Sequence, residues 1–358
     1  MSLKKEKICL FIDTFHPGGA ERVCINYANE LTSIGYNVTI IIYNKSKVCN
    51  TDKIDSRVRI ENLDVSDGIQ AFKKLLFNPT ILNEYSVGIA FNHQIALIIN
   101  FLVFLKASNM KLIARNVNNM AMDLNLQKGS FFKGLITQAL MKVFYKKIGS
   151  YIAQCEVMKS NMISYLNVKP EQIVVIHNPI SREFFKLPIS KKNDVLFVGR
   201  LKKQKGIVYL KEIIDKIQSL GNDYRFTFIG SGEFEIELLS FLDEKSVNYT
   251  YIPESDDMNL YYNSSRVTIL TSLYEGYPNV LVESLACGTP VISFDCDSGP
   301  REIIKEGING FLIPCYNVDL FSGKIIESLE SNFSIEPQNS NELEVKKLDA
   351  FLERICEH

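Results

Sequence analysis

The sequence predicts an α/β protein made of two Rossmann-like, doubly wound parallel-sheet domains. The chain has 358 residues, whereas single domains cluster near roughly 100–200 residues. Short apolar runs alternate with helical patterns along both halves, which is typical of doubly wound sheets. The alternation pauses once, in the polar stretch 181–194, where we place the linker. We therefore expect an N-terminal domain over 1–180, a C-terminal domain over 190–340, and a helix in 341–358 that packs back toward the N-terminal domain.

The first half begins with a strand, a glycine-containing loop and a helix. The apolar run at 8–12 predicts the strand, and the pattern that follows predicts a helix from about Ala20 to Ser33. This order is the βα unit of a parallel sheet. Further strands of this half are predicted at 38–43, 87–91, 112–114, 151–153 and 173–176, with helical patterns between most of them.

Two glycines, Gly18 and Gly19, lie between that first strand and helix. Glycine lets a backbone pass close to a ligand, and a helix N-terminus presents free N–H groups, so this loop suits a phosphate or a sugar. A simple tight turn is the alternative. The G-x-G-x-x-G fingerprint and the G-x-x-x-x-G-K-[ST] motif are both missing here, which argues against nicotinamide and ATP chemistry.

The second half repeats the strand–helix alternation with a different sequence. Its strands are predicted at 195–198, 226–229, 249–252, 267–271, 291–294 and 311–313, and its helices at 206–220 and 234–245. A last helical pattern runs from Leu343 to Cys356, after a polar connection. The two halves share no tandem repeat.

Composition and the termini exclude several classes of protein. Hydrophobic residues at 46% and charged residues at 23% are near the averages for globular proteins, which excludes a disordered, collagen-like or coiled-coil chain. The longest nearly apolar run, at 95–105, is about half of the roughly 20 residues that a bilayer-spanning helix needs. The N-terminus lacks a signal-peptide core, and the cysteines form no C-x-x-C pair. We expect a cytoplasmic protein.

Charge is spread unevenly along the chain. Residues 1–186 carry 23 basic and 14 acidic side chains, and residues 187–358 carry 17 and 27. A basic half points to a polyanion, a phosphorylated ligand or an anionic membrane surface. The stretch 124–152 has no acidic residue, and its segment 130–148 reads as a basic amphipathic helix that could lie on the inner face of the plasma membrane. The alternative is a helix packed on its own domain. No nucleic-acid-binding module accompanies the charge, so we expect no nucleic-acid partner.

Two cations follow the first strand of the second half. The segment GRLKKQKG places Arg200 and Lys205 at the carboxyl end of that strand, where open α/β sheets bind ligands. A guanidinium grips a diphosphate at two points and an ammonium adds a point charge. The alternative is a solvated basic loop.

The most specific element is the segment 275–290, which follows the strand at 267–271. Pro278 lies near the start of a helix, in agreement with its preference for the first turn. Glu275 then lies in the loop and Glu283 in the second turn, about 10 Å apart on helical geometry. A diphosphate can sit on the helix N-terminus, while a carboxylate on either side accepts hydrogen bonds from sugar hydroxyl pairs. The segment therefore predicts a nucleotide-sugar site.

The string EGYPNVLVESLACGTPVI resembles the E-x7-E signature of the retaining glycosyltransferases of family 4. The segments GRLKKQKG, HPGGAER and SGPREIIKEGINGFLIP fall where that family has its counterparts, so the resemblance spans nearly the whole chain. It implies the GT-B fold, in which two Rossmann-like domains face a cleft. It also implies a nucleotide-sugar donor as substrate, with no cofactor and no required metal.

The resemblance also implies roles for particular residues. Arg200, Lys205 and Glu275 would be catalytic, the two cations holding the diphosphate and the carboxylate holding the donor sugar. Glu283 would hold the ribose, and Gly18 and Gly19 would close on the donor from the opposite domain. The other implied donor-binding residues are Gly230, Ser231, Ile252, Tyr277, Pro278, Asn279 and Val280.

The implied activity is retaining, metal-independent transfer of a hexosyl group, with a UDP-sugar donor favoured over a GDP-sugar. The implied acceptor is a saccharide, free or linked to polyprenyl diphosphate, in the assembly of a capsule, O-antigen or lipopolysaccharide. Two alternatives stay open: a UDP-sugar 2-epimerase of the same fold, and a non-catalytic nucleotide-sugar binder.

The chain departs from the family pattern at the acceptor side. Many members carry a histidine after the strand equivalent to 112–114, where this chain has Arg115 and Asn116. These two residues, with His16 and His93, are the acceptor candidates. The D-x-D segment at 295–297 follows a strand in a domain of the wrong kind for a metal site, so we expect no metal there.

Overall fold

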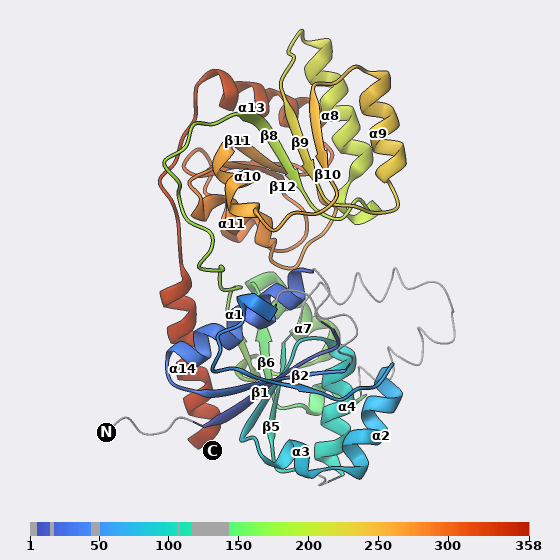
Figure 1. Ribbon diagram of the computed structural model, residues 1–358, viewed down its shortest axis with the longest axis vertical. Helices are drawn as coiled ribbons and strands as arrows, with labels where there is room; N and C mark the ends of the chain where they lie inside the picture. Colours follow the sequence, from blue (N-terminus) through green and yellow to red (C-terminus); the bar gives the residue numbers. More distant parts are fainter. Residues whose placement is uncertain (1–5, 15–17, 44–50, 106–107, 116–142, 358) are drawn as a thin grey trace. The chain divides into compact units, whose positions relative to one another are not determined.

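The computed structural model describes residues 6–14, 18–43, 51–105, 108–115 and 143–357. The chain forms two compact units. The first contains Met1–Pro179 together with Ser340–His358, and the second contains Ile180–Asn339 (Figure 1). The chain therefore passes between the units twice.

The first unit contains a sheet of parallel strands in the order β3-β2-β1-β4-β5-β6-β7. The strands are β1 (Lys7–Ile12), β2 (Asn37–Ile42), β3 (Arg59–Asn62), β4 (Val87–Ala90), β5 (Lys111–Arg115), β6 (Ser150–Ala153) and β7 (Ile173–Val175). From β1 the chain moves outward to β3, then returns to β4 on the other side of β1. The order therefore reverses between β1 and β4, which is where doubly wound sheets hold ligands at their carboxyl edge.

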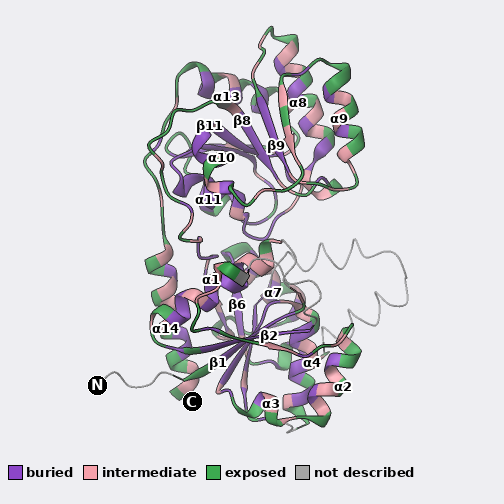
Figure 2. Ribbon diagram, in the orientation of Figure 1, coloured by how far each residue is buried: buried purple, intermediate pink, exposed green. Residues whose placement is uncertain are grey.

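Helices cover both faces of this sheet. They are α1 (Gly19–Ser33), α2 (Gly68–Phe77), α3 (Thr80–Asn83), α4 (His93–Phe104), α7 (Glu156–Leu166) and α14 (Asn341–Glu357), with 3-10 turns η2 (Thr51–Lys53), η3 (Tyr145–Lys147) and η4 (Pro170–Gln172). Alternate residues of β1, such as Ile8 and Leu10, face a core shared with α1 and α14. Strand side chains alternate between faces, so α2 and α4 cover the opposite face. Figure 2 shows the buried strands between helices whose outer sides are exposed.

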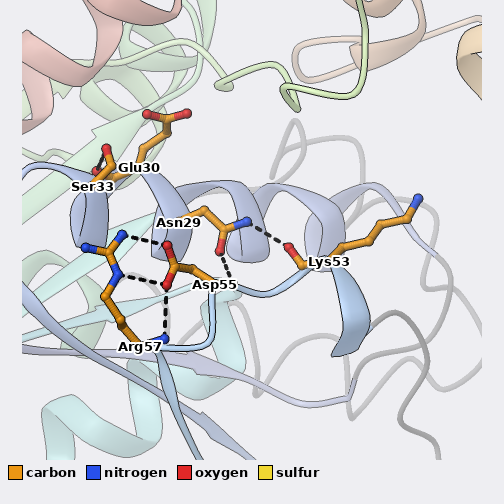
Figure 3. A network of polar contacts seen from close by, with 6 residues as sticks. All are labelled: Asn29, Glu30, Ser33, Lys53, Asp55 and Arg57. Atoms are coloured by element: carbon orange, nitrogen blue, oxygen red, sulfur yellow. Dashed lines mark hydrogen bonds and ion pairs between the residues drawn. The ribbon is translucent and has the colours of Figure 1, made fainter.

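The strand β3 was not predicted from the sequence. Its four residues, RIEN, are mostly polar, and it forms the edge of the sheet beside β2. The segment before it is fixed by Asn29 of α1, which donates to the Lys53 carbonyl (2.9 Å) and accepts from the Asp55 amide (2.8 Å) (Figure 3). Asp55 in turn holds the guanidinium of Arg57. Tertiary hydrogen bonds, rather than an apolar run, therefore place this strand.

The last helix, α14, belongs to the core of the first unit. Leu348, Phe351 and Leu352 are buried in the same core as α1. Glu344 accepts a hydrogen bond from the amide of His177 (2.8 Å). The chain therefore returns to the first unit and completes it.

The second unit contains a parallel sheet in the order β10-β9-β8-β11-β12-β13. The strands are β8 (Asn193–Val198), β9 (Phe226–Ile229), β10 (Tyr249–Ile252), β11 (Ser265–Leu270), β12 (Val291–Phe294) and β13 (Gly310–Ile313). The helices are α8 (Ile207–Ser219), α9 (Glu235–Glu244), α10 (Met258–Ser264), α11 (Asn279–Ala286), α12 (Pro300–Ile303) and α13 (Val318–Glu330), with the 3-10 turn η5 (Lys203–Lys205). Both sheets are wholly parallel and covered by helices on both faces, which confirms the predicted fold class.

One segment differs from what its pattern suggests, and another is described only in part. The stretch 181–194, expected to be a linker, is bound to α10 of the second unit, since Asn263 accepts from the Leu187 amide (2.7 Å) and donates to the Phe185 carbonyl (2.9 Å). The predicted basic helix at 130–148 lies outside the described residues up to 142. Residues 143–144 are helical, and the 3-10 turn η3 follows them. Among the helices that the described residues form, none has the length and apolar content to cross a bilayer.

Candidate functional site

The order of strands in the second unit reverses between β8 and β11. From β8 the chain moves outward through β9 and β10, and from β11 it moves the other way through β12 and β13. The loops after β8 and β11 therefore lie at the switch point of the carboxyl edge, the usual ligand position in such sheets. These loops, 199–206 and 271–278, contain five of the residues singled out by sequence: Arg200, Lys205, Glu275, Tyr277 and Pro278.

Backbone and amide hydrogen bonds tie these two loops together. The Leu273 amide donates to the Gln204 carbonyl (2.8 Å), and the Gln204 side chain donates to the Tyr274 carbonyl (3.0 Å). Gly206 makes the close approach possible. Its φ is +65°, and a Cβ there would lie 2.0 Å from the Thr271 carbonyl oxygen. Only glycine fits such a position, so Gly206 allows the two loops to approach each other this closely.

The loops bring Lys205 and Glu275 into direct contact. Lys205 Nζ lies 2.6 Å from Glu275 Oε1, and the two side chains are only 13% and 10% exposed. Ser272 Oγ also donates to Glu275 Oε1 (2.7 Å), and the Ser298 hydroxyl donates to the Glu275 carbonyl oxygen. Lys205 and Ser272 therefore hold the Glu275 carboxylate, and Ser298 holds the main chain of the same residue. The sequence indicated both charged residues but not that they form a pair.

The loops after β8, β9 and β10 also meet at this edge. The Gly230 amide donates to the Ile252 carbonyl (2.9 Å), and the Leu201 amide donates to the Ser231 carbonyl (2.9 Å). Gly230 has φ +133°, and a Cβ there would lie 2.1 Å from the Gly199 carbonyl oxygen. The sequence-predicted residues Gly230, Ser231 and Ile252 are therefore brought beside the loop of Arg200.

Arg200 itself is exposed on this loop. Within the described part of the chain, its side chain has no hydrogen bond or ion pair. A guanidinium carries five N–H donors and stays charged at any pH at which proteins are folded. Arg200 is thus available to an anion at the carboxyl edge.

Glu283 projects from α11, the helix that follows the Glu275 loop. Pro278 is the N-cap of α11, so the predicted helix start is correct to within one residue. Glu283 is buried, and its Oε2 accepts a hydrogen bond from the hydroxyl of Tyr262 (2.8 Å), a wholly buried residue of α10. Tyr277 and Val280 are also buried, and Asn279 is half-buried. The helix N-terminus therefore lies next to the Lys205–Glu275 pair in the chain, with a second buried carboxylate one turn further on.

Two thiols near these carboxylates are held in the protonated form. Burial raises the pKa of Cys287 to about 12, and the charge of Glu283 adds to the shift. Burial, with Glu275 as the next cause, also raises the pKa of Cys296 well above its usual value. A protonated thiol is a poor nucleophile and a poor metal ligand.

The described residues contain no group of three or more histidine, cysteine or carboxylate side chains placed to hold a metal. Within the D-x-D segment, Asp295 forms an ion pair with Arg301. That sugar transfer by this chain requires no metal stays a prediction.

In the first unit, the predicted glycines lie at the switch point of the sheet. Gly18 is the N-cap of α1 and Gly19 is its first residue. His93 is the first residue of α4, at the carboxyl end of β4, and its Nε2 is buried without a hydrogen-bond partner within the described residues. Burial lowers the pKa of His93, so its imidazole is neutral at pH 7. His16 and Asn116 lie outside the described residues.

Arg115 does not fit the role of an acceptor contact. Its side chain is 0% exposed at the end of β5. The guanidinium carbon lies 5.2 Å from the ring centre of Tyr27 and 5.0 Å from that of Phe91, and Nη2 donates to the Asn178 side chain. Two aromatic faces and an amide stabilise this buried cation, so the described contacts assign it to the interior of the first unit.

Sequence reasoning missed three residues that hold Glu275 and Glu283. Tyr262 and Ser272 donate to the carboxylates, and Ser298 donates to the main-chain carbonyl of Glu275. Serine and tyrosine are common at exposed and half-buried positions, so their identity carries no signal. Ser272 lies only three residues before Glu275, and this short spacing is the one feature that could have suggested a contact.

The two halves of the chain match two family models. Residues 179–343 match Glycosyl transferases group 1, and residues 17–184 match Glycosyltransferase Family 4. An uncharacterized glycosyltransferase of Haemophilus influenzae is 28% identical over 95% of this chain and 94% of its own length. An amylovoran biosynthesis glycosyltransferase of Erwinia amylovora is 26% identical, covering 92% and 93%.

A third relative is an α-1,4-N-acetyl-D-galactosaminyltransferase of Campylobacter jejuni. It is 26% identical over 86% of this chain and 85% of its own length, and its name gives a GalNAc saccharide on PP-undecaprenol as its substrate. Among solved structures, Anabaena HepE in complex with UDP has a TM-score of 0.76 at 15% identity, covering 99% of this chain and 100% of that one. TarM of S. aureus, in a complex that includes UDP, has a TM-score of 0.72 at 14% identity, covering 99% and 97%. These likenesses confirm the predicted GT-B fold.

Proposed function

Because the chain belongs to the glycosyltransferases matched by these two family models, we propose that it transfers a sugar from a nucleotide-sugar donor to a saccharide acceptor, with retention of configuration at the anomeric carbon. The observation that carries this proposal is the carboxyl edge of the second unit. There, Lys205 and Glu275 form a buried pair, Glu275 lies in the loop that leads into α11, and the exposed Arg200 lies in the same loop as Lys205. Cations beside a helix N-terminus suit a diphosphate.

Each group has a proposed role in donor binding. Arg200, Lys205 and the segment 277–280 at the N-terminus of α11 bind the diphosphate. Glu275 accepts from hydroxyls of the donor sugar while it holds the Lys205 ammonium in place. Glu283, oriented by Tyr262, accepts from the ribose hydroxyls. The backbone around Gly230, Ser231 and Ile252 lies beside the base. Gly18 and Gly19 remain predicted donor contacts from the first unit.

The proposed step breaks the bond between the anomeric carbon and the diphosphate oxygen. The acceptor hydroxyl oxygen forms the new bond to that carbon on the same face, and its proton passes to the departing diphosphate. Negative charge develops on the diphosphate as the bond breaks, so fixed cations and helix N–H groups stabilise the transition state more than the ground state. This route needs no protein base.

UDP is the proposed nucleotide. HepE was solved with UDP, with UDP-glucose, and with UDP and glucose together, and TarM was solved with UDP. At their low sequence identity these structures support only the fold, so the nucleotide rests on analogy with them. We propose no metal and no cofactor for the step.

The proposed acceptor is a saccharide of a surface polysaccharide, carried on a polyprenyl diphosphate at the cytoplasmic face of the plasma membrane. The names of the relatives support this class of acceptor. They include amylovoran biosynthesis, a PP-undecaprenol-linked substrate and a lipopolysaccharide 1,6-galactosyltransferase of Salmonella typhimurium, which is 29% identical over 44% of this chain.

A donor screen tests this proposal. The unfolding temperature of the full chain is measured with a panel of UDP- and GDP-sugars, because a ligand that binds only the folded state raises it. The donor found is then incubated with lipid-linked saccharides, and transfer is followed by mass spectrometry. Arg200→Ala and Glu283→Gln should each lower kcat/KM for the donor, and the control Asp215→Asn, which removes a surface ion pair with Lys245, should not. Donor consumption without any acceptor would indicate an epimerase, and unaltered transfer in both site variants would refute the assignment.

A further inference from the structure

Lys191 lies at the amino edge of the sheet in the second unit, at the opposite end of the strands from the candidate site. It comes shortly before β8, and Thr289 comes shortly before β12. The ammonium of Lys191 donates a hydrogen bond to the hydroxyl of Thr289 (2.5 Å), which is a wholly buried residue. The ammonium is therefore held against a buried surface, although the side chain as a whole is exposed.

No carboxylate balances the charge of this ammonium. Among the residues that the structure describes, Lys191 forms no ion pair with an aspartate or a glutamate. Burial lowers the pKa of Lys191 to about 8, Cys287 opposes this shift, and the charge of Lys186 adds to it. The ammonium of Lys186 is itself 3.9 Å from the exposed carboxylate of Glu336. At pH 7.5 about a quarter of such an amine is neutral, against about 0.1% of an ordinary lysine.

The neutral amine is the nucleophilic form of lysine. Its fraction at pH 7.5 is about 200-fold larger here than in an ordinary lysine. A less basic amine is also a weaker nucleophile, by about tenfold on the dependence known for thiols, so a gain in reactivity of at least about tenfold remains. Lys186 and Lys192 are exposed in the same segment, and their charges attract an anionic reagent.

We propose that Lys191 is a site of acylation by an activated, anionic acyl compound, either an acyl phosphate or an acyl thioester. The neutral amine attacks the acyl carbon and forms a C–N bond. The C–O bond of the acyl phosphate, or the C–S bond of the thioester, breaks, and its electron pair leaves with the phosphate or the thiolate. The amine proton passes to water, so the modified side chain ends in an uncharged amide.

Acylation of Lys191 acts on the candidate site through Thr289. The Thr289 hydroxyl donates to the carbonyl of Tyr262 (2.7 Å), and the hydroxyl of Tyr262 donates to Glu283 (2.8 Å). The Thr289 amide also donates to the carbonyl of Ser284 (3.0 Å), the residue after Glu283. A hydrogen bond from a cation polarises the Thr289 hydroxyl and strengthens its bond to Tyr262. Loss of the charge therefore weakens the support of Glu283, and this consequence rests on the proposed role of Glu283 in nucleotide binding.

Site-resolved mass spectrometry of the full chain tests the reactivity of Lys191. The protein is incubated at pH 7.5 with acetyl phosphate and, separately, with acetyl-CoA, and the acetylation rate of each lysine is measured. Lys191 should react at least about tenfold faster than Lys192, the exposed residue next to it, with at least one reagent. The reagent that gives the faster reaction identifies the acyl source. In urea the two lysines should react at equal rates, because the unfolded chain no longer buries the ammonium.

Two results would overturn the acylation site. One is equal acetylation rates of Lys191 and Lys192 in the folded protein with both reagents. The other is a preference for Lys191 that persists in urea, because such a preference would come from the local sequence rather than from the fold.

Two variants test the link to Glu283. Lys191→Gln removes the charge, as acylation does, whereas the matched control Lys191→Arg keeps it. Lys191→Gln should raise the Kd of UDP, measured by calorimetry, by about threefold or more, and Lys191→Arg should change it by less than about twofold. The unfolding temperature without UDP shows whether both variants fold as the wild type does. An equal UDP Kd in the wild type and Lys191→Gln would overturn the link.

The same measurements separate this inference from the proposed function. If the wild-type chain does not bind UDP, the proposed nucleotide and the link to Glu283 both fail. The acetylation rates still decide whether Lys191 is an acylation site, because they need neither a donor nor an acceptor.

Discussion

Replacement of Glu275 by glutamine tests the centre of the proposed site. The change removes the negative charge that faces Lys205 at 2.6 Å, and the pair is nearly buried. Breaking a buried ion pair by removing one partner costs about 3–5 kcal/mol, because the other charge stays buried. The glutamine amide oxygen can still accept from Lys205 and Ser272, so we expect the lower end, about 3 kcal/mol.

The assay is thermal and urea unfolding of the full chain, followed by a probe of the second unit. For a unit of this size, 1 kcal/mol shifts the unfolding temperature by about 2–4 °C, so Glu275→Gln should lower it by about 6–12 °C. The double variant Lys205→Met, Glu275→Gln removes both charges and should lose much less than the sum of the single variants. Asp215→Asn breaks the solvent-exposed pair with Lys245 and should change stability by less than about 1 kcal/mol.

A strictly additive double variant would refute the reasoning, because two residues that form a buried pair must be coupled. A loss for Glu275→Gln no larger than that for Asp215→Asn would refute it as well. The change in unfolding temperature on addition of UDP is an independent test of the role of Lys205. If the diphosphate lies on Lys205, UDP should stabilise the wild type more than Lys205→Met, and equal stabilisation of both proteins would exclude this contact.

Three further predictions concern other parts of the structure. Gly206→Ala should destabilise the chain by more than about 2 kcal/mol, because its φ is +65° and the new Cβ would meet the Thr271 carbonyl oxygen. The control Gly221→Ala is also at positive φ but has open space around it, so it should destabilise the chain by only about 1 kcal/mol. Equal losses of stability in the two variants would contradict the clash. Tyr262→Phe should raise the donor KM several-fold with a smaller change in kcat, because Glu283 loses its hydrogen bond. The control is Tyr249→Phe, which removes a hydroxyl that donates to the exposed Asp243. An unchanged donor KM in Tyr262→Phe would exclude the positioning role of Tyr262. Glu344→Gln should reduce the pH dependence of unfolding in acid. Burial tends to raise the pKa of Glu344, but hydrogen bonds from His177 and Lys347 outweigh it and lower the pKa to about 2. The wild-type carboxylate therefore contributes stability above about pH 4.5 that is lost as the pH falls toward 2, and identical pH profiles for the two proteins would refute this contribution.

Most of the fold could be read from local sequence patterns. The strands β9, β10 and β12 have the predicted bounds, because short runs rich in aromatic and β-branched residues, bounded by polar, glycine or proline residues, are typical of strands. The edge strand β3 could not be found in this way, because its residues Arg59–Asn62 are mostly polar and are placed by hydrogen bonds from α1. The predicted helix at 130–148 is described only from residue 143 on, where helical residues 143–144 lead into the 3-10 turn at Tyr145–Lys147, so the rest of it stays a prediction.

The candidate site, like the fold, could be predicted only in part from the sequence. Residue type and spacing identified Arg200, Lys205, Glu275 and Glu283, since each follows a strand end or starts a helix in a pattern suited to a diphosphate and sugar hydroxyls. The contacts that fix the geometry of these four side chains could not be predicted from the sequence. Lys205 and Glu275 are 70 residues apart in the chain, and Tyr262 and Glu283 are 21 apart.

The sequence by itself determined the alternation of strands and helices, the glycines that allow close backbone approaches, and the charged residues at strand ends, because these depend on neighbours along the chain. Only the tertiary structure decided which of those residues meet. Lys205 reaches Glu275 because β8 and β11 are adjacent in the sheet, and Arg115 is interior because Tyr27 and Phe91 enclose it. Such contacts arise from the order in which strands pair and helices pack, which the local pattern of side chains does not record.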